Sequence, residues 1–93
     1  MTDEQKQIEI HIRKMNFRRY REDMLRKYDI LRINILHGDI DAKTNLPYEP
    51  LNAVEKQWRL DMLNFTDLIT ENTTYLDYPE TPERLKEIWK GDW

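Results

Sequence analysis

The chain has 93 residues, of which 39% are hydrophobic and 35% are charged, and its formal net charge is −3. This length allows one domain at most, and the lack of cysteine excludes disulfides and thiolate metal sites. No apolar run approaches the ~20 residues that cross a bilayer, and the polar start MTDEQKQ is unlike a secretion signal. We therefore expect one soluble, cytoplasmic domain over residues 1–93 that has no membrane partner.

The residues up to Leu36 predict one long helix over about residues 3–36. Neither glycine nor proline occurs there, strong helix formers dominate, and Thr2 is suited to cap the start. Apolar residues recur at helical spacing in two sets that are out of phase with each other. The first set is Ile8, Ile12 and Met15, and the second is Phe17, Tyr20, Met24, Tyr28, Leu31 and Ile35. We expect a continuous helix whose buried face rotates, and the alternative is a break near Met15-Asn16.

Residues 37–51 predict an ordered loop, and a second helix follows over about residues 53–71. Gly38 is suited to a left-handed helix cap, and prolines at positions 47 and 50 interrupt regular structure. Asn52 and Glu55 have the spacing of a capping box at the start of the second helix. The apolar stripe of that helix is Val54, Trp58, Met62, Phe65 and Ile69.

The rest of the chain predicts an extended connector over residues 72–80 and a short helix over about 82–90. Thr81, Pro82 and Glu83 supply a cap, a proline at the first helical position and an acidic first turn. No segment shows the alternation of a convincing strand. The predicted fold class is all-α, an antiparallel two-helix hairpin with a short C-terminal helix, because the two long apolar stripes must bury each other.

The sequence lacks the residues of the common reactive centres. It has no serine or cysteine nucleophile, and its two glycines cannot form a phosphate-binding loop. His11 and His37 are far apart along the helix and do not form a metal-ligand pair. We therefore expect no enzyme activity, no metal and no cofactor.

Aromatic residues in the second half of the sequence predict a surface that binds another protein, because tryptophan is enriched at interface hot spots. The expected partner-binding residues are Trp58, Tyr78, Pro79, Trp89 and Trp93. The sequence also leaves open whether the chain forms a homo-oligomer. A heptad-like series, Ile10, Phe17, Met24 and Leu31, supports either a dimer or an intramolecular seam.

A basic run with interleaved aromatic residues extends from Arg13 to Arg21. Such a run suits phosphate contacts and base stacking, but the residues from Gly38 onward contain twelve acidic and six basic residues. The run therefore favours pairing with the acidic second half, and nucleic-acid binding is the less favoured reading. Arg18, Arg19 and Arg21 are the candidates for electrostatic contacts with a partner.

Three segments resemble the tail-assembly chaperones of tailed bacteriophages. Residues 21–30 are similar to that family's R-x-x-L-L-x-x-x-D-W helix, with Ile30 in place of the tryptophan. Residues 55–63 are similar to its W-x-x-Y-R-x-x-L helix, with Glu55 and Trp58 replacing the two aromatic residues, and residues 78–83 are similar to its W-P-x-x-P segment. The resemblance implies a non-enzymatic phage protein, in the host cytoplasm or the virion, that binds a tail or tail-fibre polypeptide. The alternatives are a small phage-encoded inhibitor of a host protein and a nucleic-acid-binding protein.

Overall fold

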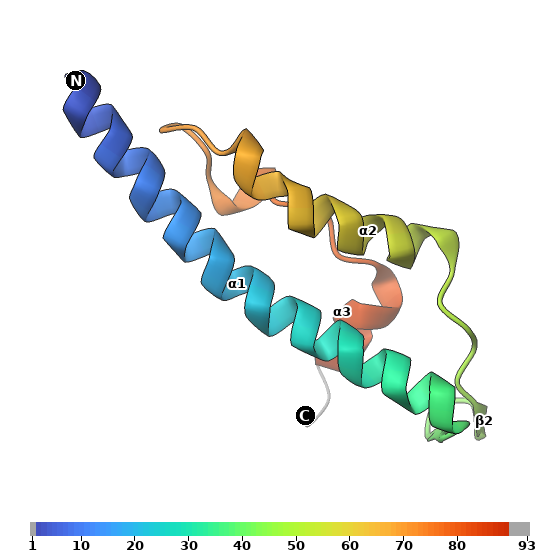
Figure 1. Ribbon diagram of the computed structural model, residues 1–93. Helices are drawn as coiled ribbons and strands as arrows, with labels where there is room; N and C mark the ends of the chain where they lie inside the picture. Colours follow the sequence, from blue (N-terminus) through green and yellow to red (C-terminus); the bar gives the residue numbers. More distant parts are fainter. Residues whose placement is uncertain (1, 90–93) are drawn as a thin grey trace.

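The computed structural model describes residues 2–89, except for the side chains of residues 88 and 89. The described chain is mostly helical and elongated, with extents of 56 × 25 × 18 Å (Figure 1). Its elements in chain order are α1 (Asp3–His37), β1 (Ile40–Asp41), β2 (Leu46–Pro47), α2 (Ala53–Asn64), the 3-10 turns η1 (Phe65–Leu68) and η2 (Tyr75–Asp77), and α3 (Glu83–Trp89). None of the helices in this part of the chain combines the length and the apolar character needed to cross a membrane.

Helix α1 is continuous through Met15-Asn16, and both of its ends are capped by local hydrogen bonds. At the start, the Thr2 hydroxyl accepts from the Gln5 backbone N–H, and the Gln5 side chain accepts from the Thr2 backbone N–H. At the end, Gly38 has a φ of 70° and donates its N–H to the Ile35 carbonyl oxygen at 3.1 Å. Glycine adopts this left-handed conformation without steric cost, so the predicted cap is confirmed.

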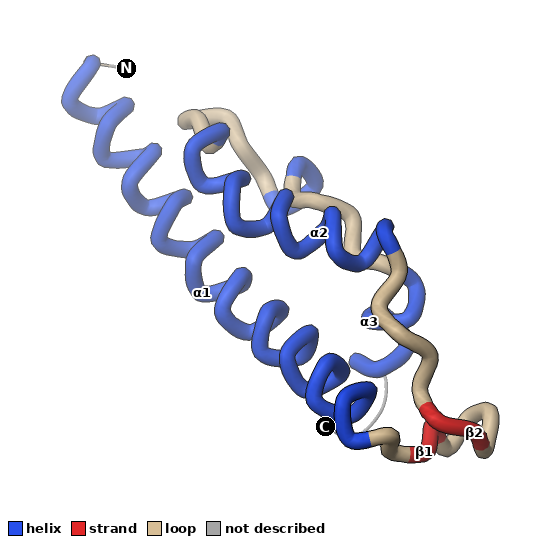
Figure 2. Tube along the Cα trace, turned by 45° about the vertical axis from the view of Figure 1, so that its right-hand side comes forward, coloured by secondary structure: helices blue, strands red, loops and turns tan. Residues whose placement is uncertain are grey.

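A two-stranded antiparallel sheet follows α1 and contradicts the expectation of no strand. Strands β1 and β2 pair Ile40 with Pro47 and Asp41 with Leu46 (Figure 2). The turn between them is held by Asp41, which accepts from the Lys43 and Asn45 backbone N–H groups, and Asn45 has a φ of 58°. Strands of two residues are too short to produce the alternation that reveals a strand in a sequence.

Helix α2 begins as expected but ends earlier than the predicted residue 71. Its capping box is present, because Asn52 and Glu55 exchange backbone-to-side-chain hydrogen bonds of 2.9 and 2.8 Å. The helix ends at Asn64 and tightens into η1. The connector is also less extended than expected, since Tyr75–Asp77 form the 3-10 turn η2.

Helix α2 runs back along the middle of α1, and α3 lies between the second half of α1 and the loop that leads to α2 (Figures 1 and 2). The buried core that these elements share consists of Phe17, Met24, Tyr28, Leu31, Trp58, Met62, Ile69 and Leu85. Because α1 has 35 residues and α2 has 12, α2 does not cover the whole of α1. The expected mostly helical fold is confirmed, but the expected antiparallel two-helix hairpin is less clear, because one long helix has shorter elements packed along it.

The buried face of α1 does not rotate, which corrects the expectation from the two apolar sets. The second set supplies the four buried residues of α1, whereas the first set stays exposed: 53% for Ile8, 45% for Ile12 and 39% for Met15. The heptad-like series also contributes to the core, since Phe17, Met24 and Leu31 are at most 5% exposed. Three of the four members of that series, all except Ile10, therefore belong to the intramolecular core.

Candidate functional site

An open cleft of about 530 Å³ lies between α2 and the connector that leads to α3. Its walls are formed by Ala53, Val54, Gln57, Trp58 and Asp61 of α2 and by Pro79 and Glu80 of the connector. Trp58 and Pro79 are twenty-one positions apart in the sequence, so the fold brings together two of the expected partner-binding residues. Among the surfaces formed by residues 2–89, we take this cleft as the candidate binding site.

Trp58 forms a wall of the cleft and does not project from it. Its side chain is 3% exposed, and its ring centroid lies 6.1 Å from that of Tyr28 in the core. The buried Nε1–H makes no hydrogen bond to the described part of the protein. Val54, which is 68% exposed, is the apolar side chain that an occupant of the cleft would cover.

The rim of the cleft is acidic. Asp61 and Glu80 both belong to its lining, and Asp61 accepts a hydrogen bond of 2.9 Å from the Gln57 side-chain amide. An apolar floor with carboxylates at the rim suits a segment that carries apolar and basic side chains, because complementary charge favours a correctly oriented partner.

Tyr78 lies outside the cleft, in an aromatic cluster. Its ring centroid is 4.7 Å from that of Phe17, 4.9 Å from that of Tyr20 and 5.7 Å from that of Phe65. Burial raises the pKa of the Tyr78 phenol, the nearby Tyr20 adds to the rise, and Arg13 opposes it. The sequence did not reveal this cluster, because a tyrosine before a proline carries no local sign of which side it faces. A contact of Tyr78 with a partner stays a prediction.

The side-chain positions of the other two tryptophans that were predicted to bind a partner cannot be described. The side chain of Trp89, at the end of α3, and the whole of Trp93 lie outside the described residues. Their part in binding stays a prediction.

A buried ion pair fixes α3 against the start of α2, and the sequence reading missed it. The Glu55 side chain is 1% exposed, and both of its oxygens accept from Arg84: Nε donates to Oε2 at 2.7 Å, and Nη2 donates to Oε1. Arg84 also donates to the backbone carbonyl oxygens of Glu49, at 2.7 Å, and Pro50, at 3.3 Å. The capping box identified Glu55 but not its partner, because the two residues are 29 positions apart.

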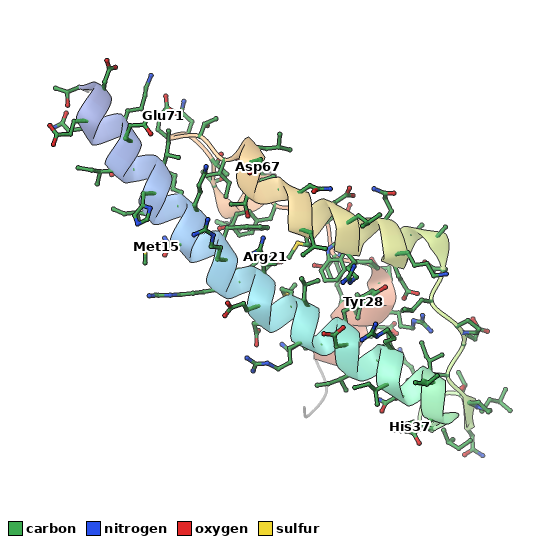
Figure 3. The ribbon with its side chains drawn as sticks, in the orientation of Figure 1. Met15, Arg21, Tyr28, His37, Asp67 and Glu71 are labelled. Atoms are coloured by element: carbon green, nitrogen blue, oxygen red, sulfur yellow. The ribbon has the colours of Figure 1, made fainter. Side chains whose placement is uncertain are left out.

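The basic run of α1 is divided between internal contacts and solvent. Arg13 donates to the Thr73 carbonyl oxygen at 2.6 Å, and Arg21, which Figure 3 labels on α1, donates to the Thr66 hydroxyl at 3.2 Å. Arg18 and Arg19 are exposed. The run therefore pairs with the second half of the chain, as expected, but through neutral oxygens at these two arginines.

An acidic partner occurs nearer the start of α1, where Lys6 lies 3.4 Å from the Glu71 carboxylate. A hydrogen bond from its own backbone N–H holds the pKa of Glu71 below the usual value, and Lys6 lowers it further. This contact ties the segment after η1 to the first turns of α1. No three potential metal ligands gather anywhere in the part of the chain that the structure describes.

Comparison with protein-family models, with curated proteins and with solved structures found no significant match to this chain.

Proposed function

We propose that this protein is a non-enzymatic binding module that holds a segment of another protein in the cleft between α2 and the connector. The observation that carries the proposal is the meeting of Trp58 and Pro79 in one open cleft beside the exposed Val54. Concave, largely apolar sites with a few polar groups are the usual places where proteins take up ligands.

The kind of partner that we propose is a tail or tail-fibre polypeptide of a tailed bacteriophage. Support comes from the resemblance described above and from the proximity of its three segments. Tyr28 of the first segment packs on Trp58 of the second, and Trp58 lines the cleft with Pro79 of the third. In this proposal, α1 and α2 act as the two arms of a helical hairpin that presents the cleft to an assembling virion protein.

The test is co-expression with tail and tail-fibre polypeptides, followed by pull-down of a tagged chain. Val54→Asp places a charge in the cleft, and Leu68→Asp is the matched control, because these side chains are 68% and 69% exposed but only Val54 lines the cleft. We expect capture of a tail polypeptide by the parent chain and by Leu68→Asp, and its loss in Val54→Asp. Equal capture by the two variants, or none by the parent chain, would contradict the proposal.

A second candidate is an inhibitor that binds a basic surface of a host protein, and the acidic rim at Asp61 and Glu80 favours it. Such binding would weaken steeply as salt rises, because electrostatic steering is screened. A stable complex with one host protein at low salt, and no tail polypeptide captured, would select this candidate over the first. Nucleic-acid binding is weaker still, since Arg13 and Arg21 already hold neighbouring segments.

A further inference from the structure

The face of α1 that points away from α2 carries a regular series of exposed side chains. From Ile8 to Leu36 the series advances by alternating steps of four and three residues, which is the spacing of a coiled-coil seam. Its apolar members are Ile8, Ile12 and Met15 at one end and Ile33 and Leu36 at the other. They are all of the large hydrophobic side chains that α1 exposes, from 39% for Met15 to 81% for Leu36. Figure 3 shows Met15 pointing away from the core.

The middle of the same series is charged, and the sign alternates along it. Arg19, Glu22, Arg26 and Asp29 occupy these four positions, and all four are exposed. At ~100° per residue, the whole series lies about half a turn from the buried side chains of α1. The chain uses one face of α1 for its own core, and no element among residues 2–89 covers the opposite face.

We propose that this face binds the same face of a second copy of the chain, with the two α1 helices antiparallel. In an antiparallel pair centred on position 24, the numbers of two facing residues of the series add up to 48. Ile12 then faces Leu36 of the second copy, and Met15 faces Ile33. Every exposed apolar residue of the series within the overlap of the two helices therefore meets another apolar residue.

The charged positions agree with the same register. Arg19 faces Asp29 of the second copy, and Glu22 faces Arg26, so each charge in the series meets its opposite. The twofold axis repeats these contacts. Two pairs of opposite charges therefore lie on each side of the centre of the dimer. Beside the seam, residues meet at number sums of 50 and 46, which brings Arg18 near Arg32 of the second copy and Asp23 near Asp23 of the second copy. Each of these like-charge pairs is offset within one chain, because Asp29 lies 3.6 Å from Arg32 and Lys27 lies 3.5 Å from Asp23.

Other arrangements of the same face do not give this match. A parallel pair in register places Arg19 against Arg19 and Glu22 against Glu22, and like charges in contact are unfavourable. An antiparallel pair moved by one heptad places Ile12 against Asp29 and Met15 against Arg26. The complementarity therefore selects one orientation and one register.

The pairing uses side chains that are already exposed in one chain. The overlap covers about 27 residues, or roughly 40 Å of helix at 1.5 Å per residue. The cleft beside α2 lies away from this face of α1, so both copies could bind a partner. The inference does not depend on the proposed function.

Sedimentation equilibrium of the full chain tests the pairing. We expect a species of twice the 11.5 kDa monomer mass. Glu22→Lys and Arg26→Glu each place like charges in contact across the axis, and each should weaken the dimer by at least about tenfold. The double variant exchanges both charges and should restore dimerisation. Asp67→Lys changes charge on the exposed surface of η1 and should leave the dimer unchanged.

Orientation is tested with a short bis-maleimide, since the chain has no native cysteine. Met15→Cys mixed with Ile33→Cys should form a cross-linked heterodimer, whereas Met15→Cys alone should cross-link poorly. A monomer at all concentrations, or a double charge variant that stays monomeric while circular dichroism shows normal helix content, would overturn the inference. Strong self-linking of Met15→Cys would overturn the antiparallel orientation.

Discussion

Replacement of Arg84 by methionine should destabilise the protein far more than the loss of a surface arginine. In the folded chain, Arg84 is the residue that neutralises Glu55, whose side chain is 1% exposed. Without Arg84, the Glu55 carboxylate would keep only one of its hydrogen bonds in the described structure, the one from the Asn52 backbone N–H at 2.9 Å. The carbonyl oxygens of Glu49 and Pro50 lose the same donor. Removing one partner of a buried ion pair costs ~3–5 kcal/mol.

That loss is a large part of the ~5–15 kcal/mol that stabilises a typical domain. For a chain of this size it corresponds to a fall in Tm of at least about 12 °C. The matched control is Arg32→Met, because Arg32 makes an exposed ion pair with Asp29, with side chains 60% and 52% exposed. Such pairs contribute ~0–1 kcal/mol. Urea unfolding at one fixed protein concentration, followed by circular dichroism, measures both variants.

A double variant separates the cost of leaving the buried Glu55 carboxylate without its cation from the cost of losing the packing of Arg84. Glu55→Gln removes the carboxylate charge and keeps an oxygen that can accept from the Asn52 N–H, as a capping box requires. Combining it with Arg84→Met should therefore recover part of the stability that Arg84→Met alone loses. Together with Glu55→Gln alone, the three variants give the coupling energy of the pair. Equal losses in Arg84→Met and Arg32→Met, or no recovery in the double variant, would refute the reasoning.

Three further predictions follow from features of α1 and the aromatic cluster. Phe17→Ala removes a fully buried ring whose centroid lies 4.9 Å from that of Phe65, and it should lower the free energy of unfolding in urea by ~3–5 kcal/mol. A loss under ~1 kcal/mol would contradict the place of Phe17 in the core. Tyr78 should ionise above the usual tyrosine pKa because burial disfavours the phenolate. The contribution of the protonated Tyr78 phenol to stability is therefore present below pH ~10 and is lost as pH rises through its folded-state pKa. The difference between the ultraviolet titrations of the parent chain and Tyr78→Phe measures that pKa. A Tyr78 pKa at the usual tyrosine value would contradict the prediction. Gly38→Ala should cost ~1–2 kcal/mol through backbone strain alone, because φ is 70° and no atom lies within 4 Å of an added Cβ; a thermal melt equal to that of the parent chain would contradict this account.

The local parts of the fold could be predicted from the sequence because their causes lie within a few residues. Thr2 with Gln5, Asn52 with Glu55, and Gly38 are caps formed by neighbours in the chain. These signals place the start of both long helices and the end of the first. The early end of α2 at Asn64 has no comparable local signal, since the apolar spacing continues through Phe65 and Ile69.

The candidate site was predictable only in part. Trp58 and Pro79 were expected to bind a partner, and the fold places both in the cleft. The contact of Tyr78 with Phe17 could not be predicted, because the direction of a side chain in an irregular segment depends on contacts with distant residues. A contact of Tyr78 with a partner stays a prediction. The apolar set at Ile8 and Ile12 has helical spacing like a buried stripe, and spacing alone cannot tell a core from a surface that another chain covers.

The ion pair between Glu55 and Arg84 also has a consequence for the order of folding. Seven-residue helices are marginal by themselves, so α3 depends on its docking through Arg84 and the buried Leu85. The first turn of α2 depends on α3 in return, because Arg84 neutralises its capping carboxylate. During synthesis on a ribosome, α2 should therefore remain frayed at its start until residues 81–85 have left the exit tunnel.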